Sequence, residues 1–345
     1  MKKQFDALLV VSFGGPEGME DVIPFLKNVL RGKNVPEERM LAVAKHYEQF
    51  GGISPINQQV RELITALETV LKEEGPDLPI YWGNRNWHPM LEDTLKQMVD
   101  DGIENALYFV TAAYGSYSSC RQYRENVEEA LKPLGDSALS LEKIRLYFNH
   151  PGFLGANREH LKEALGNFSK SEVENLRVLF SAHSIPESMS ERCRYVEQLQ
   201  ETASLIAGQA GVDSYELVYQ SRSGPPNQPW LEPDILDRMK SLKEEGIVNI
   251  IVLPVGFISD HMEVIYDLDT EARTLAEELN IKYVRAKTVG THPLFVAGIR
   301  ELILEKSEGK EPLYMGDLGL VEDQCSTDCC KPAPRPAMPG HRSSS

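Results

Sequence analysis

The chain has no apolar run close to the ~20 residues that a helix needs to cross a bilayer, and it lacks an excess of positive charge. Its 36 Lys and Arg residues stand against 52 Asp and Glu residues, which gives a formal charge of −16. A chain this acidic repels nucleic-acid phosphates and anionic membranes, so we expect no nucleic-acid partner and no integral membrane contact. The first apolar run ends in Gly-Gly-Pro instead of a signal-peptide cleavage site, which predicts a cytoplasmic protein.

Cysteine is scarce, with five residues in 345, but three of the five lie together near the C-terminus. In an acidic chain without a signal peptide, this clustering predicts a metal centre instead of disulfides. A [2Fe–2S] cluster needs four thiolates, and the tail that carries Cys325, Cys329 and Cys330 could fold back on Cys120. Zinc held by four thiolates is the alternative. We interpret Cys193, in an expected helix, as a packed thiol.

The sequence contains an internal duplication. Three pairs of segments match in the same order: 8–16 with 177–186, 81–117 with 219–259, and 150–161 with 292–302. Strands such as ALYFV and NIIVLPV are continuous apolar runs, which are typical of parallel sheets covered by helices on both faces. We therefore predict an α/β fold of two similar Rossmann-like lobes, each a parallel sheet flanked by helices, with a cleft between them.

The duplication also predicts the domain organisation. We place an N-terminal lobe at 1–165 and a C-terminal lobe at 172–306, followed by an extension over 307–330 that carries the cysteine cluster. Residues 331–345 are rich in Pro and Ser and should form a disordered tail. Open α/β sheets bind ligands beyond the carboxyl ends of their strands, so functional side chains should follow the apolar strands.

One buried strand of the second lobe runs into a segment with a carboxylate at every fourth position: Glu263, Asp267 and Glu271. On a helix these side chains stack along one face, where like charges cost a few tenths of a kcal/mol per pair. The stripe suggests a path for a cation or for protons, although a solvated acidic face has the same spacing.

His183 directly follows another strand of the second lobe. A neutral imidazole opposite Glu263 would suit the removal of protons during the uptake of a divalent metal. The alternative is a turn histidine bonded to the backbone. Asp260 and His261 precede Glu263 and either orient the imidazole or cap the following helix.

Five segments, LLVVSFGGPEG, FGGISPIN, SAHSIP, YQSRSGPPNQPWLEP and LPVGFISDHMEVIYDLDTE, resemble those of ferrochelatases, which insert ferrous iron into a porphyrin ring. The resemblance covers about residues 5–306. It implies two Rossmann-like lobes around a porphyrin, with His183 as the active-site histidine and Glu263 as its acidic partner across the porphyrin. It also implies that Asp267 and Glu271 continue an acidic line outward, so that all four residues handle the metal.

Within this family the chain is more similar to the coproporphyrin-using branch of actinobacteria and related bacteria. The similarity lies in the runs WGNRNWHP and AAYGSYSSCRQYRENV, and LRGKNVPEERMLAVAKHY has six charged residues where a membrane-binding apolar lip is expected in the other branch. The resemblance implies Fe²⁺ insertion into coproporphyrin III to form coprohaem in haem biosynthesis, with handover to the next enzyme of the pathway. Family members with one internal and three C-terminal cysteines bind [2Fe–2S].

The resemblance also suggests residues that contact the porphyrin. Position 13 is Phe, where some bacterial relatives carry a Tyr that ligates the iron. Tyr123 resembles the tyrosine that takes this part in actinobacterial-type enzymes, although it could instead only pack its ring against the porphyrin edge. The propionates need cations or donors at the rim, for which the candidates are Tyr47, Ser54, Arg121 and Arg124.

Three alternatives remain open at this point: protoporphyrin IX as the substrate, a non-enzymatic tetrapyrrole carrier, and a chelatase for cobalt or nickel. A carrier would not need a base, an acid and an outward line of carboxylates together. The cobalt and nickel enzymes usually carry a second histidine in place of Glu263. These two differences favour iron insertion.

Overall fold

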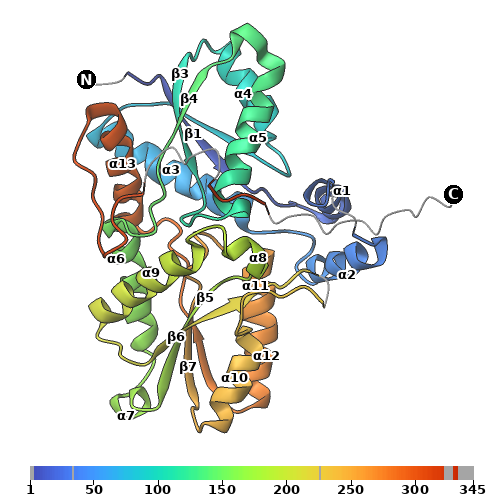
Figure 1. The fold of residues 1–345 in the computed structure, drawn as a ribbon, viewed down its shortest axis with the longest axis vertical. Helices are drawn as coiled ribbons and strands as arrows, with labels where there is room; N and C mark the ends of the chain where they lie inside the picture. The colour runs from blue at the N-terminus through green and yellow to red at the C-terminus, as the bar shows by residue number, and fades with distance from the viewer. Residues whose placement is uncertain (1–3, 33–34, 225–226, 322–328, 333–345) are drawn as a thin grey trace, which may run out of the picture.

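Two four-stranded parallel sheets form the centres of two lobes in a computed structural model that describes residues 4–32, 35–224, 227–321 and 329–332 (Figure 1). The strand order is β2-β1-β3-β4 in the first sheet and β6-β5-β7-β8 in the second. The strands are β1 (Ala7–Ser12), β2 (Ile80–Asn84), β3 (Asn105–Val110), β4 (Ser140–Lys143), β5 (Leu176–His183), β6 (Tyr215–Gln220), β7 (Asn249–Leu253) and β8 (Lys282–Arg285). The matching order confirms the predicted α/β fold of two similar lobes.

The central strands are buried because helices cover both faces of each sheet. All six residues of β1 and all five of β7 are buried. Both faces of these strands therefore need apolar side chains, which explains the continuous apolar runs in the sequence. The parallel pairing places the carboxyl ends of neighbouring strands at one edge of each sheet, where His183 ends β5.

Helices connect the strands in both halves of the chain. The first half contains α1 (Met19–Val29), α2 (Glu37–Glu48), α3 (Ile56–Glu74), α4 (Leu91–Asp100), the π-helix η1 (Tyr117–Arg121), α5 (Gln122–Leu131), the 3₁₀-helix η2 (Lys132–Ser137) and α6 (Pro151–Leu165). The second half contains α7 (Lys170–Val173), α8 (Glu187–Ser190), α9 (Tyr195–Ala210), α10 (Ile235–Glu244), α11 (Met262–Tyr266), the π-helix η3 (Asp267–Ala272), α12 (Arg273–Glu278) and α13 (Pro293–Glu308).

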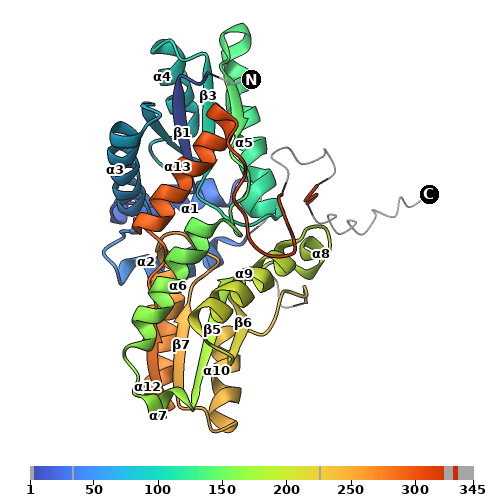
Figure 2. The ribbon, with the colours of Figure 1, turned by 90° about the vertical axis from the view of Figure 1, so that its left-hand side faces the viewer.

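The last helix of each half packs on the other lobe. α6, at the end of the first half, lies against α9 of the second lobe, whereas α13 lies against α3 of the first lobe (Figures 1 and 2). α6 and α13 also pack against each other. The two halves are therefore interlocked. The internal repeat could not predict this exchange, because a repeat shows which segments match and not which sheet a helix covers.

Two glycines allow the close approach of α6 and α13. A Cβ atom on Gly152 would lie 2.4 Å from the carbonyl oxygen of Leu294, and a Cβ atom on Gly298 would lie 2.9 Å from the ring of His150. Both distances are too short for a side chain, so each position requires glycine. This contact fixes how the second lobe sits on the first.

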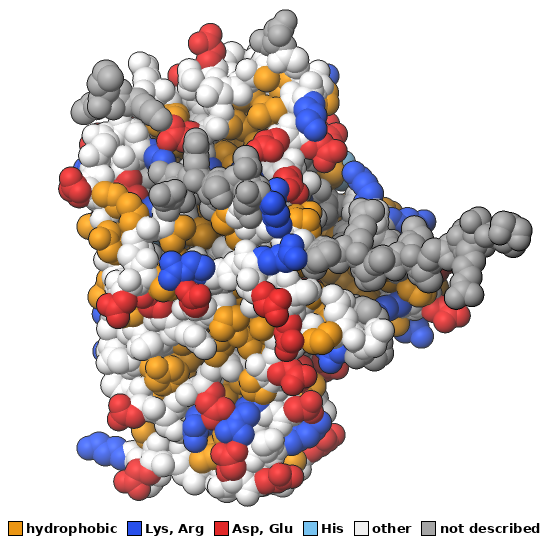
Figure 3. Space-filling model, in the orientation of Figure 1, with side chains coloured by type: hydrophobic (Ala, Val, Ile, Leu, Met, Phe, Trp, Pro, Cys, Tyr) orange, Lys and Arg blue, Asp and Glu red, His pale blue; other side chains and the backbone are white. Residues whose placement is uncertain are grey.

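The charged surface does not form a single acidic patch on the face drawn in Figure 3. Red acidic and blue basic side chains alternate there over both lobes, between small orange apolar areas. Within the described part of the chain, no helix combines the length and the apolar character required to cross a membrane. The cytoplasmic location stays a prediction from the sequence.

Candidate active site

His183 ends β5, and two hydrogen bonds fix its position. Its Nδ1 atom bonds to the backbone carbonyl of Ser184, and because a carbonyl can only accept, Nδ1 carries a proton. The Tyr195 hydroxyl donates to the His183 carbonyl oxygen at 3.0 Å. The remaining ring nitrogen, Nε2, lies 3.5 Å from Oε1 of Glu263. His183 therefore presents its titratable nitrogen directly to a carboxylate.

This contact corrects the expected placement of Glu263. The resemblance placed Glu263 across the porphyrin from His183, yet both side chains belong to the second lobe and are only 3.5 Å apart. Carbon atoms in contact are already about 3.5–4.0 Å apart, so no porphyrin plane fits between the two groups. The two groups are therefore direct neighbours within the second lobe.

The pair also corrects the expected charge of His183. Burial alone would lower the pKa of the imidazole, but the carboxylate of Glu263 outweighs it and raises the pKa to about 9. His183 is therefore an imidazolium at neutral pH and not the neutral imidazole that the sequence suggested. The pair holds one proton between a base and an acid, both partly open to solvent, with side-chain exposures of 31% and 51%.

Glu263 lies in the first turn of α11, which His261 caps. The His261 Nδ1 atom accepts a hydrogen bond from the backbone N–H of Glu263 at 3.2 Å, so that nitrogen is unprotonated. Burial lowers the pKa of His261, in agreement with a neutral ring. Asp260 is held elsewhere, by Arg285 at 3.1 Å, and its backbone N–H donates to Gln59 of α3. His261 is therefore the cap of α11, and neither residue contacts His183 by a hydrogen bond.

The carboxylate stripe runs through a π-helix instead of a regular α-helix. α11 ends at Tyr266 and η3 continues from Asp267 to Ala272. The wider turn of a π-helix changes the register, so the spacing of four residues does not stack the carboxylates as the sequence suggested. π-helical turns are common at functional sites because they redirect side chains. The first lobe has a π-helix, η1, in the equivalent place after β3.

Asp267 occupies the most buried part of the stripe. Burial raises its pKa to about 7, a hydrogen bond from the Ser221 hydroxyl opposes this shift, and the charge of Glu263 adds to it. Ser221 follows β6 with a positive φ of 61°, which a non-glycine residue rarely adopts. Gln220 donates to the backbone carbonyl of Glu263 at 3.0 Å and so links β6 to α11. Asp267 can therefore gain or lose a proton near neutral pH.

Glu271 lies further out and is exposed. Burial and the nearby Asp234 raise its pKa, and its charge acts on Asp267. Asp269, on another side of η3, instead pairs with Arg285 at 2.8 Å and with Arg273 at 3.5 Å. The charges of Glu263 and Glu271 thus both act on Asp267, which lies between them. Asp269 is not part of this stripe, and its charge is neutralised by the two arginines.

The first lobe contributes Tyr47 to this region. Tyr47 is the last buried residue of α2, and burial together with the charge of Glu263 raises the pKa of its hydroxyl. The Tyr47 ring contacts the Phe25 ring edge-on, with 6.1 Å between the ring centroids. Phe13 contacts the other side of this group, with its ring centroid 6.2 Å from that of Phe25. Ser54 is also buried, next to Gly15. Tyr47 and Phe13 therefore belong to one aromatic group that faces the second lobe near Glu263.

Tyr123 lies on α5 and is buried beneath Arg85. The Arg85 guanidinium lies 4.4 Å from the centre of the Tyr123 ring and 5.7 Å from that of Phe13. Burial raises the pKa of Tyr123, and Arg85 opposes the shift. Arg85 was not among the residues predicted from the sequence. It directly follows β2, at the carboxyl end of a strand, where an open α/β sheet is expected to place functional side chains.

The two arginines predicted from the sequence, Arg121 and Arg124, have partners. Arg121 donates to Glu125 at 2.7 Å and to the backbone carbonyl of Cys329 at 2.8 Å. Arg124 pairs with Glu128 at 3.7 Å. Arg121 therefore holds the C-terminal segment against the first lobe, and the propionate role of both residues stays a prediction.

The cysteines lie in three segments. Cys120 is buried in η1, and Cys329 and Cys330 have their sulfur atoms 3.4 Å apart. Cys325 lies outside the described residues. Cys193 lies between α8 and α9 and not in a helix as the sequence suggested, and its thiol donates to the backbone carbonyl of Met189 at 3.4 Å. The thiol of Cys330 lowers the pKa of Cys193. Among the described residues, no group of three or more His, Cys, Asp or Glu side chains is arranged to hold a metal ion.

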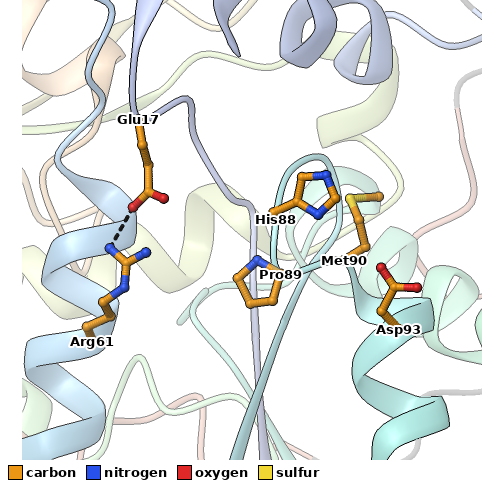
Figure 4. Close-up of a pocket in the computed structure, with 6 residues that line it drawn as sticks. All are labelled: Glu17, Arg61, His88, Pro89, Met90 and Asp93. Atoms are coloured by element: carbon orange, nitrogen blue, oxygen red, sulfur yellow. Dashed lines mark ion pairs between the residues drawn. The ribbon is translucent and has the colours of Figure 1, made fainter.

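A separate pocket of about 380 Å³ lies on the first lobe. Figure 4 shows Glu17 and Arg61 on one side and His88, Met90 and Asp93 on the other. Glu17 and Arg61 pair with each other at 2.6 Å. None of these residues is among the predicted site residues.

The sequence profile described as Ferrochelatase matches residues 5–307. The chain belongs to the ferrochelatase family. It is thus a metal chelatase, a lyase that acts on a porphyrin and ferrous iron in haem synthesis. The prediction of the family and of an enzyme is confirmed, and the non-enzymatic carrier is set aside.

Similar proteins of the family match almost the whole chain. A "Ferrochelatase" from Rhodopirellula baltica is 50% identical, covering 98% of this chain and 97% of its own length. A "Coproporphyrin III ferrochelatase" from Streptomyces coelicolor is 47% identical, covering 97% of this chain and 96% of its own. The solved structure of the sirohydrochlorin chelatase SirB from Bacillus subtilis subspecies spizizenii, in complex with cobalt, has a TM-score of 0.53 at 13% identity and covers 89% of this chain and 97% of its own. That likeness confirms the chelatase fold.

Proposed function

We propose that this family member inserts Fe²⁺ into coproporphyrin III to form coprohaem. Relatives named coproporphyrin III ferrochelatase, from Streptomyces coelicolor and Nocardia farcinica, are 47% and 45% identical over 97% of the chain. The chemical part of the proposal rests on one observation, the contact of His183 with Glu263 at the carboxyl end of β5. Protoporphyrin IX is the alternative substrate.

The reaction must remove two pyrrole protons and strip water from the metal. His183 and Glu263 share one proton, so the pair can pass it on and then accept one from the porphyrin. Once the imidazolium has given up its proton, the imidazole nitrogen and the carboxylate oxygens are also ligand types that suit Fe²⁺. We assign proton acceptance to the pair as a unit, because strongly interacting groups titrate together.

Asp267 and Glu271 would extend this pair into a path. The pKa of Asp267, about 7, lets it take a proton from the pair and release it near neutral pH. The same oxygens could carry Fe²⁺ in the opposite direction, since hard oxygen ligands suit that ion.

The first lobe would supply most of the porphyrin-binding contacts. Phe13 offers a flat apolar surface, and Tyr123 would approach the iron from the side opposite His183, which requires Arg85 to move off its ring. Tyr47 and Ser54 offer hydroxyl groups to propionates, together with Arg121 and Arg124 at the start of α5.

We expect coproporphyrin III to be metalated with a kcat/KM at least about tenfold above that of protoporphyrin IX. Coproporphyrin carries four carboxylates against two, and two additional charged hydrogen bonds of about 1 kcal/mol each would exceed a tenfold difference. The α2 region supports this preference, since its exposed Leu41 and Val43 stand among charged residues. The measurement is anaerobic Fe²⁺ insertion into both porphyrins, followed by absorbance.

The same assay contains its control, because Zn²⁺ insertion into each porphyrin reports substrate preference independently of iron oxidation. If the two porphyrins have equal kcat/KM values, whichever metal is used, or if protoporphyrin IX is preferred, the coproporphyrin proposal is contradicted. The family assignment would remain intact.

We also propose that Cys120, Cys325, Cys329 and Cys330 hold a [2Fe–2S] cluster. The thiol donors suit iron–sulfur ligation, and the bond from Arg121 to the Cys329 carbonyl brings the tail to the residue next to Cys120. Such a group would act as a cross-link between the tail and the first lobe, remote in sequence from His183. Zinc held by the same thiolates is the alternative.

We expect protein purified without oxygen to show visible absorbance from this cluster. Replacing Cys120, Cys329 or Cys330 by Ser should remove the absorbance, because each change deletes one of four required ligands. Cys193→Ser is the matched control and should retain it. Elemental analysis that finds zinc without iron would rule out the cluster, and loss of colour in Cys193→Ser would rule out this ligand set.

A further inference from the structure

Arg85 has only uncharged partners in the described part of the chain. Its Nε–H donates to Oδ1 of Asn126 at 2.6 Å, and its Nη1 donates to the backbone carbonyl of Ser118 at 3.4 Å. The side chain is half-buried, and every other described arginine that is not exposed pairs with Asp or Glu. A partly buried charge without an opposite charge is costly. Arg85 therefore differs from the arginines that have a structural role.

The carboxylate next to Asn126 on α5 is already bound. Glu125 accepts from the Arg121 guanidinium at 2.7 Å and from the Tyr117 hydroxyl at 3.3 Å. Asn126 offers Arg85 an amide oxygen at a short distance but no negative charge. Such an acceptor orients a guanidinium, whereas a carboxylate forms stronger, charge-assisted bonds with two parallel N–H groups of its fork. A carboxylate that arrives with a ligand can therefore displace Asn126.

The surroundings of Arg85 combine this cation with two aromatic rings. Its guanidinium lies over the rings of Tyr123 and Phe13. Its backbone N–H donates to the Ser12 carbonyl at 3.0 Å, which ties the residue after β2 to the end of β1. The cation is thus fixed at the carboxyl edge of the first sheet. A carboxylate carried by a planar apolar ring matches this combination of groups.

We propose that Arg85 binds a carboxylate of the porphyrin and leaves the Tyr123 ring as it does so. The inference rests on the proposed function, in which the substrate is a porphyrin that carries propionates. Arg85 would then link the recognition of a carboxylate to the access of the substrate to Tyr123. A ring without a carboxylate at this place would leave Arg85 on Tyr123.

The contact between Arg85 and Tyr123 explains why the two events are linked. Tyr123 is buried and packs in the apolar core of the first lobe with Val110 and Val127. The guanidinium lies 4.4 Å from the centre of the Tyr123 ring, so it covers the ring face that it contacts. A carboxylate gives the guanidinium two charge-assisted bonds in exchange for this ring contact and the bond to Asn126. Binding of the substrate can therefore drive the movement.

The test measures porphyrin affinity by fluorescence titration and Fe²⁺ insertion by anaerobic absorbance. Arg85→Gln should weaken the binding of coproporphyrin III at least about tenfold and leave the KM for Fe²⁺ within about twofold of wild type. Arg85→Lys keeps the charge without the fork and should lose affinity by an intermediate factor. The matched control is Arg158→Gln on α6, where Arg158 pairs with Glu159 at 3.3 Å, and it should bind the porphyrin as wild type does.

Asn126→Asp tests the movement, because it gives Arg85 a carboxylate within the protein and hardly changes the shape of the side chain. The new pair should hold Arg85 on Tyr123 and weaken coproporphyrin III binding at least about tenfold. Asn126→Leu removes only the neutral acceptor and should bind within about threefold of wild type. In the complex with ferric coproporphyrin, the absorbance of Asn126→Asp should resemble that of Tyr123→Phe and differ from that of wild type.

An affinity of Arg85→Gln within about twofold of wild type would overturn the proposal, and so would equal affinities of Asn126→Asp and Asn126→Leu. An Asn126→Asp spectrum equal to that of wild type would refute the movement away from Tyr123. Both porphyrins carry propionates, so each variant is compared with wild type for both. A wild-type preference for protoporphyrin IX would therefore refute the coproporphyrin proposal alone, and a loss of affinity in Arg85→Gln would still support the carboxylate contact.

Discussion

Replacing His183 by alanine should lower kcat for Fe²⁺ insertion by about 10²- to 10⁴-fold, the range that a positioned acid–base group contributes. The imidazole is fixed by the Ser184 carbonyl and meets Glu263 at 3.5 Å, so its loss removes one half of the pair that exchanges protons. Porphyrin affinity should change little, because the predicted binding contacts come from the first lobe. The measurements are anaerobic turnover by absorbance and porphyrin binding by fluorescence titration.

His160→Ala is the matched control for this experiment. His160 lies on α6, bonds to the Lys287 carbonyl at 3.2 Å and has no place in the proposed reaction, so the change should leave kcat near the wild-type value. Turnover of His183→Ala within about tenfold of wild type would exclude His183 from the proton-transfer step. A parallel loss of porphyrin binding would instead make it a binding residue.

The fold could largely be predicted from the sequence because its main signals are local. Buried parallel strands require continuous apolar runs, and the duplicated runs around β3 and β7 imply equal sheets. The exchange of α6 and α13 could not be predicted, since it depends on the fit of Gly152 against Gly298 at a contact between distant segments. The π-helix η3 could not be predicted either, because carboxylates spaced four residues apart in the sequence are compatible with an α-helix and with a π-helix.

The candidate site was predicted in its residues more than in its chemistry. The resemblance suggested that His183 and Glu263 belong together, but not that they touch within one lobe. Their distance of 3.5 Å reverses the expected charge of His183, and a pKa depends on such distances, which motifs do not contain. Tyr47 was predicted only as a propionate ligand. Burial and the charge of Glu263 also raise the pKa of its hydroxyl, a coupling that the sequence did not indicate. Cys193 was expected in a helix, because the break between α8 and α9 lacks a glycine or proline signal.

Glu263→Gln and Glu271→Gln should affect different kinetic constants. Glutamine keeps the shape and removes the charge, so Glu263→Gln should lower kcat by about 10²- to 10³-fold through loss of the acid–base pair. Glu271 is exposed and remote from His183, so its charge should only help to attract the metal. Loss of a surface charge interaction of about 1 kcal/mol corresponds to a roughly fivefold increase in KM for Fe²⁺, with kcat preserved.

The pKa of His183 gives this comparison a second readout that does not depend on turnover. Glu263 is the main group that raises this pKa to about 9, so the imidazole of Glu263→Gln should lose its proton at lower pH, whereas in Glu271→Gln it should titrate near 9. NMR titration of the His183 ring measures both values. If the two variants show equal, small kinetic effects and the same His183 pKa as wild type, the stripe is a solvated acidic face. If Glu263→Gln alone lowers kcat and the pKa of His183, and Glu271→Gln raises only the KM for Fe²⁺, the carboxylate beside His183 controls its proton and Glu271 serves the approach of the metal.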